Sequence, residues 1–403
     1  MSDPWLYIIG VGDDGLERLS PKAKSALTSA TLIIGGDRHL AMLPENDTRP
    51  RLSWPSPLMK LVNDVMDRRG EPTAILATGD PQHFGIGVTF AKRLPAEEIS
   101  IFPASSAFSL AAAALCWDLT RVHQITLHGR PLDLIRSSLY PGAKLIALSD
   151  TGKTPADVAT LLSDAGYGQS AMTVLEHMGG ETEVIRTKMA SEWIGATDIQ
   201  DLNCIAIECV ADDTAKPLPV IPGLPDDVFL HDGQLTKREI RSATLSALAP
   251  FPGMHLWDIG GGSGSIAIEW MRCHPLNTAI CVETRNDRVQ HILQNKVRLG
   301  TPLLKVIEGR APDALKEQAP PDRVFIGGGL TSGVFDYCWE QLKPGGILAA
   351  NTVTVEGEAL AFKLNELYDG ELTRLNFARA QKIGGFTSWK PSRQVTQLVL
   401  KKK

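Results

Sequence analysis

Residues 256–270, LWDIGGGSGSIAIEW, carry the pattern that predicts the fold of the second half of this chain. An apolar run leads to Asp258, four glycines follow within five residues, and a second apolar run begins at once. The first run has the length of a buried strand, and the second has the spacing of a helix. A strand, a glycine turn and a helix in this order place free N–H groups at the start of the helix. The stretch therefore predicts a loop that holds a cofactor.

Two cofactors fit this loop. Gly262, Gly264 and Ala267 satisfy the G-x-G-x-x-A form of the dinucleotide fingerprint. Asp258, two residues before the first glycine, instead suits the ammonium group of S-adenosylmethionine, because a carboxylate so close would repel a pyrophosphate. Glu283 ends the next expected strand and would bond ribose hydroxyls of either cofactor. The pattern favours S-adenosylmethionine, and a dinucleotide or a purely structural turn stays open as an alternative.

The composition excludes several classes of protein. The chain has 403 residues, enough for two or three domains, and a net charge of −5 that gives no reason to expect a nucleic-acid partner. No apolar run approaches the roughly 20 residues of a membrane span, and the start lacks a secretory signal pattern, so we expect a cytosolic protein. The six cysteines contain no C-x-x-C pair, and we expect no metal site.

A proline-rich segment divides the chain. Residues 211–227, ADDTAKPLPVIPGLPDD, carry four prolines and no apolar periodicity, which is typical of a linker. We expect a first domain over residues 1–212, a linker over 213–228 and a second domain over 229–403. Strands and helices alternate in both halves, which predicts α/β domains with mainly parallel sheets. The second half has a doubly wound order, and such sheets bind ligands at the carboxyl ends of their strands.

Three loops of the first half also follow expected strands. They occur in IIGVGDDG, TGDPQHFG and FPASSAF, and the serines of the last can cap a helix. Each loop alone is compatible with ordinary turn or cap chemistry. Together, at the strand ends of one small domain, they predict a single cleft.

The first half resembles the tetrapyrrole methylase family in the stretches GVGDDGLERLSPKA, LATGDPQHFG and ASSAFSLAAAAL. The resemblance implies two α/β subdomains with S-adenosylmethionine bound between them. It places at that cofactor Gly10, Gly12, Gly79, Asp80, Pro81, Gly85, Ser105 and Ser106. The first loop departs from the family, which often has Gly-Pro-Gly-Asp where this chain has Gly12-Asp13-Asp14-Gly15.

The second half resembles the decarboxylating precorrin methyltransferases, which have a Rossmann-like S-adenosylmethionine fold. LTKREIRSATLSAL, LWDIGGGSGSIAIE, EGRAPDAL and VFIGGGL occur in the order of that family. The resemblance places at the cofactor Thr236, Gly260, Gly261, Gly262, Ser263, Gly264, Glu283 and Ala311. Asp258, from its charge, and Arg310, from its position, are further candidates for cofactor contact. Arg310 departs from the common pattern, in which an aspartate lies near the adenine. That family tends to form tetramers, which implies a homo-oligomer.

The order of the two halves implies a bifunctional methyltransferase of cobalamin biosynthesis with one S-adenosylmethionine site in each domain. It would methylate precorrin-6B at ring carbons 5 and 15 and remove the carboxyl group of the C-12 acetate, giving precorrin-8. The resemblance assigns C-15 methylation and decarboxylation to the second domain and C-5 methylation to the first. The alternative is a NAD-dependent oxidoreductase in the second domain, with a first domain that only binds the tetrapyrrole.

Such a substrate carries many carboxylates, so its site should be basic. The candidates for substrate binding are Lys237, Arg241, Arg310 and Arg379 in the second domain and Arg130 in the first. Methyl transfer mainly needs alignment of donor and acceptor, so we expect no catalytic triad. By position alone, the candidates for proton donor or acceptor are His128, His231 and Asn351. Further candidates are His83, His123, His177 and His255.

Overall fold

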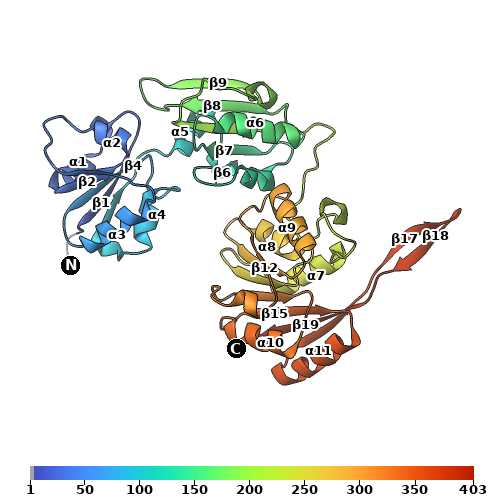
Figure 1. Ribbon diagram of the computed structural model, residues 1–403. Coiled ribbons are helices and arrows are strands. Elements are labelled where there is room, and N and C mark those ends of the chain that lie inside the picture. Colours follow the sequence, from blue (N-terminus) through green and yellow to red (C-terminus); the bar gives the residue numbers. More distant parts are fainter. Residues whose placement is uncertain (1–3) are drawn as a thin grey trace. The chain divides into compact units, whose positions relative to one another are not determined.

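The computed structural model describes residues 4–403, which form two compact units (Figure 1). The first unit extends to Lys216 apart from the segment Asp133–Leu139, and the second holds that segment and Pro217–Lys403. The boundary falls inside the proline-rich segment, and Leu218 and Leu224 of that segment pack into the core of the second unit. None of the helices within residues 4–403 is long and apolar enough to cross a membrane.

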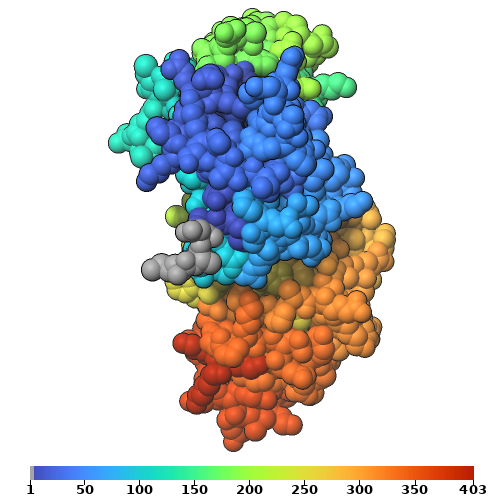
Figure 2. Space-filling view, turned by 90° about the vertical axis from the view of Figure 1, so that its left-hand side faces the viewer, coloured from blue at the N-terminus to red at the C-terminus, as the bar shows by residue number. Residues whose placement is uncertain are grey.

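The first unit begins with sheet A, whose strands are all parallel. Its strand order is β3-β2-β4-β1-β5, with β1 Leu6–Val11, β2 Leu32–Gly35, β3 Arg51–Ser53, β4 Thr73–Thr78 and β5 Ile99–Phe102. The associated helices are α1 Pro21–Ser29, α2 Asp37–Ala41, α3 Met59–Asp67 and α4 Ile86–Ala91. Ile8 and Ile9 point into separate cores on opposite faces, as expected for a sheet covered on both sides. In Figure 2 these N-terminal residues form one closely packed lobe, drawn in blue.

Sheet B completes the first unit and differs from the prediction. Its order is β6-β7-β10-β8-β9, with β6 His123–Thr126, β7 Lys144–Leu148, β8 Ala171–Glu176, β9 Val184–Met189 and β10 Asn203–Glu208. Only β6 and β7 pair in parallel, and the other three pairings are antiparallel. The expectation of a mainly parallel sheet is wrong here, because β9 follows β8 without a crossover helix and pairs directly with it. The helices of this part are α5 Ala107–Leu115 and α6 Thr154–Asp164.

The second unit is built on sheet C, of order β13-β12-β11-β14-β15-β19-β16. Its strands are β11 His255–Ile259, β12 Thr278–Glu283, β13 Lys305–Glu308, β14 Arg323–Ile326, β15 Ile347–Thr352, β16 Glu371–Leu375 and β19 Val395–Lys401. The helices are α7 Arg238–Leu248, α8 Ser265–Cys273, α9 Asn286–Arg298, α10 Ser332–Gln341 and α11 Val355–Tyr368. The five strands from β13 to β15 are parallel, with the switch point between β11 and β14.

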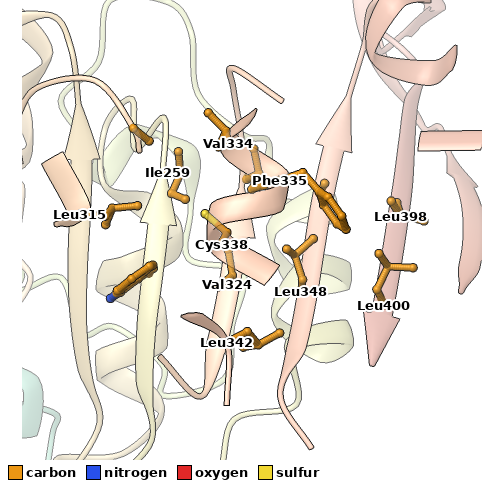
Figure 3. Packing of buried hydrophobic residues seen from close by; sticks show 14 of the residues in the cluster. Ile259, Leu315, Val324, Val334, Phe335, Cys338, Leu342, Leu348, Leu398 and Leu400 are labelled. Atoms are coloured by element: carbon orange, nitrogen blue, oxygen red, sulfur yellow. The ribbon is translucent and has the colours of Figure 1, made fainter. Parts of the chain in front are cut away.

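Two apolar layers cover sheet C. Trp257 and Leu256, neighbours in β11, pack into different clusters because successive side chains of a strand point to opposite faces. Phe335 and Cys338 of α10 cover one face, where they meet Leu348 and Leu398 (Figure 3). This two-sided burial explains why the strands are almost continuously apolar.

The basic C-terminal stretch forms strands that the sequence pattern did not predict. β19 runs antiparallel to β15, and β16 is antiparallel to β19, so β16 ends at the same edge as the parallel strands. Between them a hairpin of β17 Ala378–Ile383 and β18 Phe386–Pro391 projects from the unit (Figure 1). All of its strand residues are exposed. The hairpin therefore leaves the sheet at its carboxyl edge.

Candidate functional site

The glycine loop, residues 260–264, joins β11 to α8 at the carboxyl edge of sheet C. Gly260, Gly262 and Gly264 have φ values of +71°, +60° and +76°, a region that favours glycine. A Cβ on Gly260 would lie 2.8 Å from the carbonyl oxygen of Gly328, so the loop after β14 packs against the glycine loop. At Gly262 a Cβ would meet nothing within 4 Å. The loop thus has one face against protein backbone and one face open to a ligand.

Asp258 lies directly beneath this loop and is 1% exposed. Its Oδ2 accepts a hydrogen bond from the N–H of Ala267 at 3.1 Å, whereas its Oδ1 has no partner among the described residues. Burial raises the pKa of Asp258 to about 7, and the nearby Glu283 carboxylate adds to the rise. A buried carboxylate oxygen without a partner is costly. An ammonium group, such as that of S-adenosylmethionine, fits this oxygen in charge and in hydrogen bonding.

Glu283, at the end of β12, holds the glycine loop in place. Its Oε2 accepts the N–H of Gly262 at 2.8 Å, and its Oε1 accepts the N–H groups of Thr284 and Arg285 at 2.8 and 3.0 Å. Its side chain is therefore occupied by backbone donors in this structure. The predicted bonds from Glu283 to a ribose stay a prediction.

Asn295, which the sequence pattern did not single out, joins the glycine loop to the segment before α7. It is fully buried in α9, and its Oδ1 accepts the N–H of Leu230 at 2.8 Å. Its Nδ2 donates to the carbonyl oxygens of Leu230 and Ser263, both at 2.9 Å. The available signal was a polar residue on the apolar stripe of α9, which also contains Val289 and Ile292. Asn295 positions the segment that leads to Thr236.

Arg241 does not bind substrate in the way predicted. It is 0% exposed, and its Nε donates to Glu269 and its Nη1 to Asp226, both at 2.8 Å. The guanidinium also donates to the backbone carbonyls of Leu224 and Thr236. A buried guanidinium needs such partners to offset its loss of water. Arg241 therefore ties the end of the linker to α7 and α8, and the prediction of a substrate contact is wrong.

The other predicted cations of this unit are accessible. Arg379, at the base of the hairpin, is 48% exposed and pairs with Asp226 at 3.1 Å and Glu239 at 2.7 Å. Lys237 precedes α7, and Arg310 is exposed in the loop after β13. Within residues 4–403 neither Lys237 nor Arg310 forms an ion pair. These three cations lie on segments of the carboxyl edge, and their binding of substrate stays a prediction.

The proton-donor candidates of this unit lie at different edges of sheet C. Asn351, near the carboxyl end of β15, donates to Thr244 at 2.9 Å and accepts from Gln397 at 3.0 Å. His231 accepts the N–H of Gly233 through Nδ1, in the segment before α7. His255 begins β11 and so lies at the amino edge, opposite the glycine loop. The structure therefore rules out His255 as a group at this site.

The remaining predicted cofactor residues of this unit differ in burial and in their contacts. Ser263 is buried, and its hydroxyl has no partner in the part of the chain that is described. A Cβ on Gly261 would overlap the sulfur of Cys281, so this position has no room for a side chain. Ala311 packs in the core with Ile307, and Thr236 is half-buried. No cluster of three or more His, Cys, Asp or Glu that could hold a metal is found within residues 4–403.

A second candidate site lies in the first unit, where three loops of sheet A meet. The N–H of Gly79 donates to Val11 at 2.9 Å, and that of Ala104 donates to Gly79 at 3.2 Å. A Cβ on Gly10 would overlap the Gly79 carbonyl, so only glycine allows this approach. A cavity of about 390 Å³ opens beside these loops. Its lining includes Gly10, Gly12, Asp13, Ser105, Met178 and Gly179.

Other predicted residues of this site build its loops rather than line the cavity. Asp80 accepts the N–H of Gln82 at 2.9 Å in a tight turn, and Ser106 caps α5 by accepting the N–H of Ser109 at 3.2 Å. A Cβ on Gly85 would lie 2.7 Å from the carbonyl oxygen of Pro81, so Gly85 packs against the turn. Their role as direct cofactor contacts stays a prediction.

The histidine candidates of the first unit lie in different places relative to the cavity. His177, after β8, faces Asp13 at 2.9 Å and lies next to the cavity residue Met178. His128 is exposed and pairs with Asp150 at 3.1 Å. His123 bonds Tyr140 at 3.1 Å, and burial lowers its pKa. Of these histidines, His177 lies beside the cavity.

Comparisons with known proteins agree with this two-unit arrangement. Residues 5–192 match the family described as tetrapyrrole (corrin/porphyrin) methylases, and residues 227–402 match the precorrin methyltransferase domain. A precorrin-6Y C(5,15)-methyltransferase [decarboxylating] of Sinorhizobium sp is 46% identical over 395 residues, covering 98% of this chain and 95% of its own. The chain belongs to the family of decarboxylating precorrin-6Y C(5,15)-methyltransferases. As members of a methyltransferase family, its relatives support S-adenosylmethionine rather than the nicotinamide alternative.

Other members of this precorrin-6Y methyltransferase family extend the comparison. A protein of the same name from Mycobacterium tuberculosis (strain ATCC 25618 / H37Rv) is 37% identical over 396 residues, covering 97% of this chain and 98% of its own. The crystal structure of the C-terminal domain of precorrin-6Y C5,15-methyltransferase from Rhodobacter capsulatus is 41% identical. It covers 46% of this chain and 100% of that one, with a TM-score of 0.44.

Proposed function

We propose that this chain methylates precorrin-6B at ring carbons 5 and 15 and removes the carboxyl group of the C-12 acetate, giving precorrin-8. The observation that carries this proposal is the 46% identity to a decarboxylating precorrin-6Y methyltransferase over nearly the full length of both chains. The match of both halves to methyltransferase families, in the same chain, supports two methylations by one protein.

We assign C-15 methylation and decarboxylation to the second unit and C-5 methylation to the first. The precorrin methyltransferase match over residues 227–402 supports the first part of this division, and the tetrapyrrole methylase match over residues 5–192 supports the second. Each unit would hold one S-adenosylmethionine. When bound, this cofactor supplies an electrophilic methyl group on its sulfonium sulfur.

The residues of the second unit have separate tasks in this proposal. Asp258 offers an unpaired oxygen to the cofactor ammonium, and the open face of Gly262 lets a ligand approach the backbone. Glu283 and Asn295 hold the loop in that geometry. Since methyl transfer depends on the alignment of donor and acceptor, such holding contacts contribute to the rate.

The substrate carboxylates would meet the cations of the carboxyl edge. Lys237 and Arg310 are available, because neither pairs with a carboxylate within residues 4–403. Arg379 would have to exchange Asp226 or Glu239 for a substrate carboxylate. In decarboxylation the electron pair of the broken C–C bond enters the conjugated macrocycle, and the carbon then takes up a proton. His231 is the remaining titratable candidate for this proton, and Asn351 can orient a group but does not titrate.

The same proposal includes a homo-oligomer in the cytosol. The hairpin β17–β18 exposes three large apolar side chains, of Ile383, Phe386 and Trp389, at 63%, 82% and 72%. Exposed apolar groups of this kind are typical of surfaces that become covered in an assembly. Light scattering on the full-length chain measures the mass, and a monomer at micromolar concentration would exclude the oligomer.

Mass analysis of products from full-length variants tests the division of labour. Gly262→Arg places a side chain in the open face of the second site and should abolish decarboxylation and the first methylation. Gly253→Arg is the matched control, because Gly253 also has a positive φ and open space but precedes β11 at the opposite edge. Gly12→Trp fills the cavity of the first unit and should leave one methyl gain and the loss of CO2. Two methyl gains by Gly12→Trp would contradict the division.

A further inference from the structure

An aromatic cluster at the end of the loop after β4, formed by His83, Phe84 and Phe108, is not used by either proposed cofactor site. At its base Phe108 of α5 is fully buried. The ring of His83 stacks on Phe108 with centroids 4.4 Å apart, and the ring of Phe84 lies 5.3 Å from His83. Phe84 is 46% exposed. The Phe84 and Phe108 centroids are 5.7 Å apart, so each of the three rings contacts the other two. This cluster supports the exposed ring of Phe84.

The backbone holds Phe84 in an unusual conformation. Its φ is +60°, which costs a bulky residue free energy and is rarely adopted. The turn before it is fixed by Asp80, whose carboxylate accepts the N–H of Gln82, and by the close packing of Gly85 on Pro81. Strained positions of this kind persist where the surroundings enforce them, and they are concentrated at ligand sites. The exposed ring is thus held at a defined place by its neighbours.

A cation from the other sheet lies over this ring. Arg130 follows β6 of sheet B, and its guanidinium carbon is 5.9 Å from the centroid of Phe84. This distance is near the outer limit of a cation–π contact, which contributes little at an exposed site. Arg130 is exposed and pairs with no carboxylate in the described part of the chain. Its guanidinium can therefore leave the ring at small cost to bind an anion.

We propose that Phe84 and Arg130 form a two-point platform for the substrate of the first unit, a conjugated macrocycle that carries carboxylates. The guanidinium would take a carboxylate in a bidentate hydrogen bond. Its movement would uncover the face of Phe84, on which a conjugated ring can stack. The two contacts thus become available together. This inference rests on the proposed function and adds to it the residues that recognise the tetrapyrrole.

Kinetics and binding of the full-length chain test the platform. Arg130→Gln and Phe84→Gly are compared with Arg130→Lys, Phe84→Tyr and wild type. Phe84→Gly removes the ring but relieves the positive φ, so the free energy of unfolding should not fall. Arg121→Gln is the matched charge control, because Arg121 is 85% exposed and precedes β6, at the end opposite to Arg130.

The substrate for kinetics is the singly methylated, decarboxylated product of the Gly12→Trp chain. We expect Arg130→Gln and Phe84→Gly each to raise the KM for this substrate at least about tenfold, since one charged hydrogen bond or one stacking contact is lost. The KM for S-adenosylmethionine should stay near wild type in every variant. The KM for the tetrapyrrole should stay near wild type in Arg121→Gln. Unchanged KM values for the tetrapyrrole in both variants would overturn the platform.

Binding of uroporphyrin, a conjugated macrocycle with several carboxylates, gives a readout that does not need activity. Quenching of its fluorescence on binding gives the Kd. We expect this Kd to rise at least about tenfold in Arg130→Gln and Phe84→Gly and to stay unchanged in Arg121→Gln. If both variants bind uroporphyrin more weakly but the wild-type chain methylates no precorrin, the platform is supported and the proposed function is contradicted. If the wild-type chain methylates the precorrin and both variants bind uroporphyrin as wild type does, the function is supported and the platform is overturned.

Discussion

The carboxylate of Asp13 lies 2.9 Å from Nδ1 of His177 and thereby joins the first loop of sheet A to the end of β8 in sheet B. Its other oxygen accepts from Arg38 at 2.6 Å. Asp13 and Met178, next to His177, both line the cavity of the first unit. The contact therefore sets the distance between two walls of the proposed cofactor site, although the first loop departs from the common family pattern.

Replacement of Asp13 should affect the first unit alone. Asp13→Asn removes the charge that faces Arg38 and His177, and we expect a loss of about 1 kcal/mol in the free energy of unfolding. The KM for S-adenosylmethionine in C-5 methylation should rise severalfold, while decarboxylation continues at the wild-type rate. Asp64→Asn, at an exposed position of α3 away from the cavity lining, is the control. Equal effects of the two variants would show that the contact with His177 has no special role.

The stability of the cofactor-free second unit should depend on Asp258 and pH. An acid whose pKa is raised on folding, here from 3.8 to about 7, keeps its proton more firmly in the folded state. The free energy of unfolding should therefore fall as the pH rises from about 4 to 7, by up to about 4 kcal/mol. Asp258→Asn should flatten this dependence in denaturant titrations. An equal slope in the variant would assign the pH dependence to another group.

Cofactor binding should be linked to the same proton. A cation beside Oδ1 favours the ionised carboxylate, so S-adenosylmethionine should bind more tightly at pH 8 than at pH 6 and release protons on binding near pH 7. Calorimetry in buffers of different ionisation enthalpy measures this release. In Asp258→Asn the release from this site should vanish, whereas release of the same size would place the proton elsewhere.

Asn295 should matter both for stability and for the second cofactor site. Asn295→Ala leaves buried backbone groups of Leu230 and Ser263 without partners, and we expect a loss of about 2–4 kcal/mol. The KM for S-adenosylmethionine in the decarboxylating reaction should rise in the protein that remains folded. Gln294→Ala, on the exposed side of the same helix, should change neither quantity. Thermal unfolding and initial rates together check this prediction.

Substitution of Arg241 should mainly lower stability, whereas substitution of Arg379 should mainly weaken binding of the tetrapyrrole. Arg241→Ala leaves Glu269 and Asp226 without their buried partner, and we expect a loss of about 3–5 kcal/mol. Arg379→Ala removes exposed ion pairs and should cost less than about 1 kcal/mol, but it should raise the KM for the tetrapyrrole. Chemical denaturation and initial rates separate the two. A raised KM with unchanged stability in Arg241→Lys would restore the substrate role that its burial contradicts.

Local sequence patterns are enough to predict the class of the fold and the position of the glycine loop. The strand that contains Asp258, the turn that follows and the helix after it are specified by neighbouring residues, through apolar periodicity and the positive φ of glycine. The motifs of the two halves, in their order, also indicate the family without reference to any tertiary contact. These are features that a short window of residues encodes.

Which side chains contact one another depends on the long-range packing of the chain, which the structure shows. It placed Arg241 in the protein interior, His255 at the wrong edge of sheet C and the strands of sheet B in antiparallel pairs. It also brought Asn295 to Ser263, and Arg130 to Phe84, across more than thirty residues in each case. The sequence does not distinguish a basic or amide side chain that is solvated from one that is buried. Its role depends on the partners that long-range packing supplies, and no local pattern encodes them.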